Sequence, residues 1–198
     1  MNQELLKQAK AMFDSPEKWN AFLELVWKKD EIRNQWFLKL KEEANKKFST
    51  DEFVEGWVFY SWGVWDMHWY LKAHGDKSIG LLLGWWGELT LQCNGEFYDI
   101  AKIHDLLRSE KFAPLLSCFS RVDRFYEGGR LAIEIRNFSF GSSYDTKFDL
   151  DRLSWYAGNH TEDFLNQIVD KVNRFRKDAN ITNLLNELNS ETKKTIKS

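Results

Sequence analysis

Six of the ten tryptophans in this chain lie within thirty residues, at Trp57, Trp62, Trp65, Trp69, Trp85 and Trp86. Each indole brings a large apolar body and a single N–H donor, so tryptophans gather where a core must be filled or where a flat surface must hold a partner. The cluster therefore predicts an aromatic-rich centre for the fold and leaves both of these uses open.

Size and charge limit the classes of protein to which the chain can belong. With 198 residues, 43% of them hydrophobic, we expect one globular domain spanning residues 1–198. The net charge of -2 supplies no general basic field, so a nucleic-acid partner is not supported by charge. The N-terminus does not resemble a secretion signal and no run of eighteen apolar residues occurs, so we expect a cytoplasmic protein without a membrane partner.

The first 48 residues are predicted to form a helical N-terminal arm. Ser15 is suited to cap a helix whose first position is Pro16, where a missing N–H costs nothing. Apolar residues then recur at steps of three and four as far as Ala44, with an interruption at residues 28–30. This spacing predicts two helices, or one bent helix, ending near Phe48.

Residues 57–71 change to an alternating pattern that is typical of a strand. Trp57 and every second residue after it share one face, while the other face carries Tyr60, Trp62, Asp66 and His68. A turn signal at residues 74–77 precedes a second predicted strand over 79–93, in which three glycines indicate bulges or close packing. The two segments predict one long β-hairpin.

The rest of the chain predicts a helix over residues 100–112, a second hairpin around Gly128-Gly129, and helices from residue 159 onward with a fraying tail. The fold class expected is α+β: a four-stranded antiparallel sheet, made of two hairpins separated by a helix, packed against N-terminal and C-terminal helices. Residues 49–158 would hold the sheet and its inserted helix, and residues 159–198 the C-terminal helices.

The aromatic hairpin is the first candidate site. If the helices leave one face of the sheet uncovered, the residues predicted to bind a partner are Tyr60, Trp62, Asp66, His68, Trp85 and Trp86. If helices cover both faces, most of the indoles belong to the core. A carboxylate beside an imidazole also suits a general base or a metal, although a pair on one strand is more typical of a structural hydrogen bond.

A second candidate site lies on the predicted hairpin at residues 121–140. Asp123 followed by Glu134-Ile135-Arg136 resembles the signature of PD-(D/E)XK nucleases. The resemblance implies that Asp123 and Glu134 hold Mg2+, with Arg136 at the position of the family's lysine. No proline precedes Asp123, and arginine stays charged where lysine can lose its proton. The alternative is a row of charge pairs on the surface of the sheet.

These patterns favour a non-enzymatic protein that binds another protein through exposed aromatics, for example an inhibitor or immunity-type protein. No cofactor is expected for that function. The alternatives are a metal-dependent nuclease using Mg2+, and a small-ligand pocket lined by Trp62, Trp65, Asp66 and His68. Homo-oligomers also remain open, because the C-terminal apolar residues Leu184, Leu185 and Leu188 suit a second copy as well as the chain's own sheet.

Overall fold

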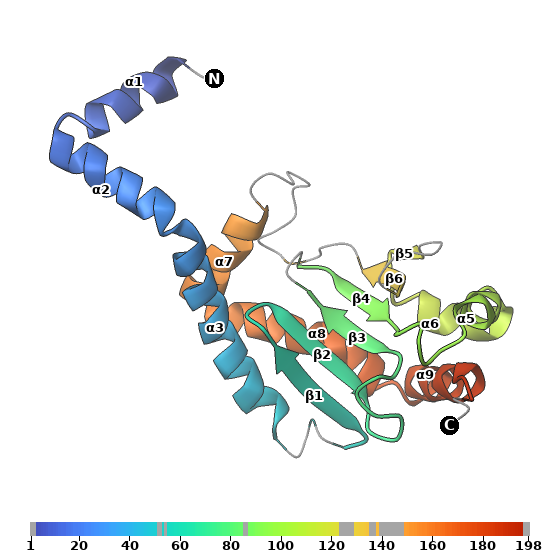
Figure 1. Ribbon diagram of the computed structural model, residues 1–198. Coiled ribbons are helices and arrows are strands. Elements are labelled where there is room, and N and C mark those ends of the chain that lie inside the picture. Colours follow the sequence, from blue (N-terminus) through green and yellow to red (C-terminus); the bar gives the residue numbers. More distant parts are fainter. Residues whose placement is uncertain are drawn as a thin grey trace.

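Helices flank an antiparallel sheet in the computed structural model, which describes residues 3–50, 53, 55–84, 87–122, 129–134, 138 and 149–195 (Figure 1). The class is α+β, as predicted. The sheet has six strands in the order β1-β2-β3-β4-β6-β5, one of them only two residues long, so the prediction of four strands is wrong.

The two predicted long strands are each folded into a hairpin. The first four strands follow one another as a meander: β1 (Trp57–Trp62), β2 (Asp66–Leu71), β3 (Gly80–Leu83) and β4 (Leu89–Gln92). Gly63 and Gly87 have φ angles of 56° and 70°, which glycine adopts without strain. Two of the three glycines interpreted as sites of bulges or close packing, Gly84 and Gly87, lie in the turn between β3 and β4, while Gly63 lies in the turn between β1 and β2. These two turns are the reason for the extra strands.

The predicted second hairpin is present as β5 (Arg121–Val122) and β6 (Arg130–Glu134), which pair antiparallel. Strand β4 pairs with β6, so this hairpin and the meander of the first four strands form one sheet.

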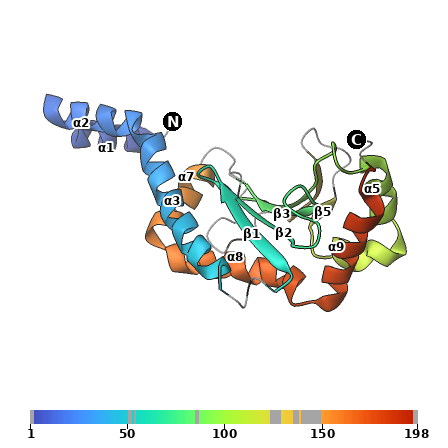
Figure 2. The same ribbon diagram turned by 60° about the horizontal axis from the view of Figure 1, so that its bottom comes forward.

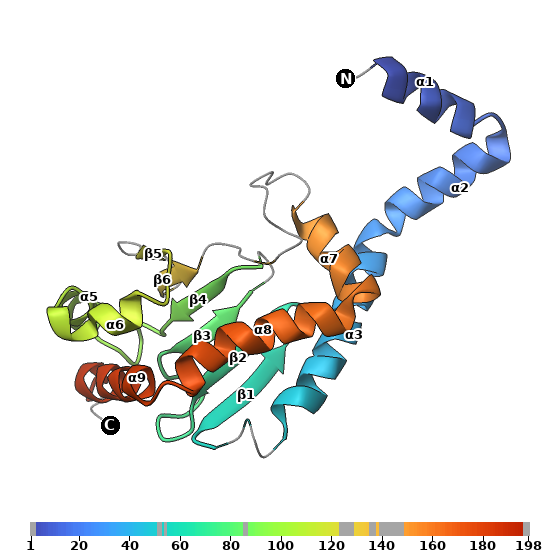
Figure 3. The same cartoon turned by 180° about the vertical axis from the view of Figure 1, so that it is seen from behind.

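Three helices make up the N-terminal region: α1 (Gln3–Met12), α2 (Pro16–Trp27) and α3 (Lys29–Phe48). The Ser15 side chain accepts a hydrogen bond from the Lys18 N–H and Pro16 starts α2, as predicted. The break at residue 28 gives two helices rather than one bent helix, and α1 is a further helix within the segment 1–48 that was predicted to be helical. Figures 1 and 3 show α1 and α2 projecting from the body, so only α3 packs on it.

The C-terminal half of α3 joins the arm to the sheet. Its buried residues are Phe37, Leu40, Ala44 and Phe48. The Phe48 ring lies 5.0 Å from the rings of Phe53 and Phe59 and 5.1 Å from that of Trp69. These contacts bury the core face of β1 and β2 against α3.

Helix α3 also lies beside the edge strand β1 (Figures 1 and 3). The Ser61 hydroxyl donates to Asn45 Oδ1 at 3.2 Å, and the Lys41 ammonium donates to the carbonyl of Gly63 at 2.6 Å. Side chains of the helix therefore bind both β1 and the turn that follows it.

Helix α7 (Asp149–Asn159) was not predicted, while α8 (Thr161–Arg176) was. Gly158 allows α7 to approach α3, because a Cβ on it would lie 2.1 Å from Trp36 Cδ1. The Lys39 ammonium donates to the Gly158 carbonyl at 2.7 Å. Figure 3 shows α8 crossing the rear of the sheet, where it covers the core face.

The remaining helices lie at the β6 side of the sheet: α5 (Ile100–Leu107), the 3-10 helix η1 (Glu110–Phe112), α6 (Ala113–Leu116) and α9 (Ala179–Thr192). Asn189 of α9 is fully buried and binds both main-chain groups of Ile79, accepting from its N–H at 2.8 Å and donating to its carbonyl at 3.0 Å. The tail expected to fray is fastened as far as Lys194, whose N–H donates to the Phe97 carbonyl at 2.8 Å.

Candidate binding site on the open face of the sheet

Even-numbered side chains of the first four strands share one face of the sheet. The paired residues include Tyr60 with His68, His68 with Leu82, and Leu82 with Thr90. Paired residues in an antiparallel ladder point to the same side of the sheet, and both residues in each of these pairs have even numbers. The faces predicted from alternation are therefore right, since the turn of three residues between β1 and β2 does not change the alternation.

Helices leave this even-numbered face uncovered over β1 to β3, at least among the described residues (Figures 1 and 2). Tyr60 and Trp62 are 52% and 39% exposed, whereas Trp57 and Trp69 on the opposite face are buried. Figure 2 shows α5 and α9 rising beside the sheet, so the open face has a wall on that side. We call this surface the open face.

Aromatic rings form a continuous row on the open face. The rings of Tyr60 and Trp62 are stacked, with centroids 5.5 Å apart and an angle of 26° between their planes. Trp62 meets the edge of His68 at 5.8 Å, and His68 lies 5.3 Å from Tyr70. Same-face neighbours on paired strands are close enough for such ring contacts, so the row follows from the strand register.

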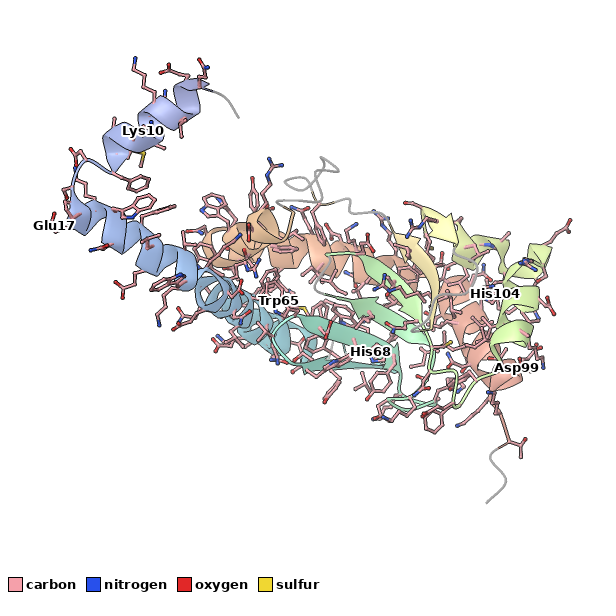
Figure 4. The ribbon with its side chains drawn as sticks, turned by 45° about the horizontal axis from the view of Figure 1, so that its top comes forward. Lys10, Glu17, Trp65, His68, Asp99 and His104 are labelled. Atoms are coloured by element: carbon pink, nitrogen blue, oxygen red, sulfur yellow. The ribbon has the colours of Figure 1, made fainter. Side chains whose placement is uncertain are left out.

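A hollow of about 490 Å3 adjoins this row. It is lined by Tyr60, Trp62, His68, Asp76, Lys77, Ser78, Leu82, Gln92, Cys93 and Asn94. A second hollow of about 590 Å3 shares Gln92, Cys93 and Asn94 and extends to His104 and Arg130. Because the two hollows share these lining residues they adjoin each other, and we call them together the groove, which runs from β1 toward α5. Figure 4 labels one residue of each hollow, His68 on β2 and His104 on α5.

Gly80 allows the imidazole of His68 to lie close to the sheet. A Cβ at residue 80 would lie 2.7 Å from His68 Nε2 and 2.6 Å from the carbonyl oxygen of Trp69. Neither distance is compatible with van der Waals contact. The glycine therefore provides the space in which His68 becomes part of the floor of the groove.

Burial decides the charge of two titratable side chains in the groove, those of His68 and Cys93. It lowers the pKa of His68 to about 4, and the negative charge of Asp76 opposes this shift only in part. Burial raises the pKa of the Cys93 thiol to about 12. At neutral pH the groove thus presents a neutral imidazole and a protonated thiol, which suit contact and hydrogen bonding better than nucleophilic attack.

His68 should make the stability of the protein depend on pH. Between about pH 6.5 and pH 4 the unfolded chain binds a proton that folded His68 does not, so the free energy of unfolding falls as the pH falls through this window. We expect a loss of about 2 kcal/mol between pH 7.5 and pH 5 from this residue. Urea unfolding at both pH values should show that loss of stability in the native chain, and His68→Phe should not show it. Equal pH dependence in the two proteins would contradict this assignment, because all other groups are shared.

The structure brings together three of the predicted binding residues, Tyr60, Trp62 and His68. Asp66 is on the same face beside the β1–β2 turn, opposite Trp62, and burial raises its pKa. The carboxylate whose negative charge affects the pKa of His68 is that of Asp76 rather than Asp66. Trp65 packs on the other side, 3.8 Å from the Phe37 ring, so it does not line the hollow with Trp62. Trp85 and Trp86 lie outside the described residues.

The nuclease alternative stays a prediction. Glu134 is the last residue of β6, opposite Leu89 of β4, whereas Asp123 and Arg136 lie outside the described residues. Within the described part of the chain, no group of three or more His, Cys, Asp or Glu side chains is arranged to hold a metal ion.

Sequence reasoning missed the part of the groove contributed by β4 and α5. His104 is 5% exposed, because α5 turns it toward β4 and β6. Gln92, Cys93 and Asn94 lie at the end of β4, where the Asn94-Gly95 pair indicates the end of a strand but not a binding site. The signal that could have found His104 is the stripe of Ile100, Ile103 and Leu107, which puts it beside the apolar face of the helix.

No protein-family model, curated protein or solved structure matches this chain. Among the described residues, no helix has the length and apolar character needed to cross a bilayer.

Proposed function

We propose that this chain is a non-enzymatic binding protein that holds a segment of another protein in the groove of the open face. The observation that carries the proposal is the stacked pair of Tyr60 and Trp62, exposed at the rim of a hollow of about 490 Å3. Tyrosine and tryptophan are the side chains that most often dominate protein interfaces, since they contribute large area with few rotatable bonds.

The charges in the groove favour a protein partner over a nucleic acid. Asp76 and Lys77 line one hollow, and Glu96 and Arg130 line the other. A phosphate backbone requires an excess of positive side chains along its path. A groove with balanced charges suits a peptide, whose own side chains carry both signs.

The size of the first hollow supports a second candidate, a small ligand held between Trp62 and His68. Its volume falls within the range of small-molecule sites, about 300–1,000 Å3. A ligand that raises the unfolding temperature of the native chain but not of His68→Phe would favour this candidate.

Selection of peptides from a random display library tests the leading proposal. Peptides that bind the native protein should bind Trp62→Ala at least about tenfold more weakly, because an exposed indole at an interface is a frequent hot spot. Trp155→Ala is the matched control, since Trp155 is 45% exposed on α7. Selected peptides that bind Trp62→Ala and Tyr60→Ala as tightly as the native chain would overturn the proposal.

A further inference from the structure

Residues 3–28, which project from the body and exclude α3, expose a large amount of apolar surface. From here on the arm means these residues. None of the residues of α2 is buried, and Trp27 is 81% exposed. Six of the exposed large hydrophobic side chains of the described chain belong to this arm: Leu6, Met12, Trp19, Leu25, Val26 and Trp27. Monomeric proteins seldom leave contiguous apolar surface in water, so this concentration marks a contact surface.

Helices as short as those of the arm need a partner to be stable. Helix α1 has 10 residues and α2 has 12, and isolated helices below about 12–15 residues are marginal in water. Local contacts fix only the elbow between them: the Phe13 ring lies 5.6 Å from Trp19 and 4.5 Å from Phe22, and Lys18 pairs with Asp14 at 2.6 Å. The elbow is preformed, and the apolar surface beyond it is left without a partner within the described body.

A hollow on the arm offers a seat for an apolar side chain. Its volume is about 520 Å3, and it is lined by Asn20, Leu23, Glu24, Trp27, Lys28 and Glu31. These residues recur at helical spacing across the junction of α2 and α3, with Leu23 and Trp27 between polar neighbours. This arrangement is typical of a surface that receives another helix.

The two helices of the arm carry opposite charge. Helix α1 contains two lysines and one glutamate, whereas α2 contains two glutamates, Glu17 and Glu24, and one lysine. Figure 4 shows Lys10 on α1 and Glu17 on α2, both away from the sheet that carries His68. A partner that places a basic helix on α2 and an acidic helix on α1 would complement both, and a second copy of the arm has this distribution.

We propose that the arm joins two copies of this chain, with α1 of each packed on α2 of the other about a two-fold axis. In such an interface both copies contribute the same surface, and the basic α1 of each copy lies against the acidic α2 of the other. The two helices extend for about 33 Å and are about 10–12 Å across, enough for an interface of standard size, about 800 Å2 on each partner. A membrane surface would instead call for a basic polar face, which the balanced charges of the arm lack.

Sedimentation equilibrium of the full chain tests this proposal independently of the groove. The native protein, of 23.5 kDa, should reach the mass of a dimer, about 47 kDa, at micromolar concentrations. Trp27→Glu should raise the dissociation constant at least about thirtyfold, because it puts a charge in place of the most exposed apolar side chain described in the arm. Trp155→Glu, a matched change on the body, should leave the mass unchanged.

Charge reversal tests the pairing of α1 with α2. Lys7→Glu with Lys10→Glu should weaken the dimer, and adding Glu17→Lys with Glu24→Lys should restore it. A chain that stays monomeric at about 100 micromolar would overturn the proposal, and so would a dimer that Trp27→Glu leaves intact. A cooperative urea unfolding transition in each variant shows that the body of the protein is folded, because α2 has no buried residue that a substitution would disturb. Peptide binding at the open face should be the same in Trp27→Glu, so failure here is distinguishable from failure of the proposed function.

Discussion

Replacing Asn189 by leucine should lower the free energy of unfolding by about 3–5 kcal/mol. Its amide binds both the N–H and the carbonyl of Ile79, and both residues are fully buried. Leucine has a similar volume but leaves these two main-chain groups without partners, and each unsatisfied buried group costs about 1–3 kcal/mol. The same amide also donates to the Leu185 carbonyl at 2.9 Å, so the loss includes the contact that orients it.

Urea unfolding followed by circular dichroism measures this effect. Asn183→Leu is the matched control, because Asn183 is on the same helix and exposed. It should change the free energy of unfolding by less than about 0.5 kcal/mol. If Asn189→Leu behaved like this control, the connection between α9 and the β2–β3 turn would contribute little to stability.

Truncating Phe48 to alanine should have an effect of similar size, about 3–5 kcal/mol. Phe48 is 1% exposed and its ring contacts Phe53, Phe59 and Trp69. Removing the ring would leave a cavity between α3, β1 and β2, three elements whose positions are fixed by one another and cannot easily collapse into the space.

Leu38→Ala provides the comparison for Phe48→Ala. Leu38 is on the same helix but 41% exposed, so its loss should cost less than about 1 kcal/mol. Thermal and urea unfolding of both variants would measure the difference. Equal effects would mean that α3 is held to the sheet by its surface contacts rather than by the aromatic cluster around Phe48.

The sequence predicted which side chains share a face but not how many strands carry them. Alternation placed Tyr60 and His68 together, and a turn of three residues kept that relation when one long strand became two. Gly63 could not be interpreted from the sequence as a turn, because a glycine in an alternating segment suits a bulge equally well. The number of strands in the sheet depends on whether each such glycine forms a bulge or a turn.

Other features depended on tertiary contacts that periodicity does not reveal. Helix α7 has an apolar stripe that includes Leu153 and Ala157, but its packing depends on Gly158 lying against Trp36. Helix α2 shows the opposite case, since the spacing around Trp19 predicted this helix correctly without showing that it projects from the body. Amphipathic spacing indicates that a helix has an apolar face, and it does not say which surface receives it.

The position of α3 beside β1 determines how a partner can be recognised. An edge strand normally presents unpaired main-chain groups that a peptide can extend into a longer sheet. Here the helix lies along that edge and holds it through Asn45 and Lys41, so a strand approaching β1 would meet α3 first. Association through the main chain of β1, including the strand addition that leads to fibrils, is therefore disfavoured at this edge. A partner of the open face, as proposed above, would be recognised by its side chains rather than by extension of the sheet.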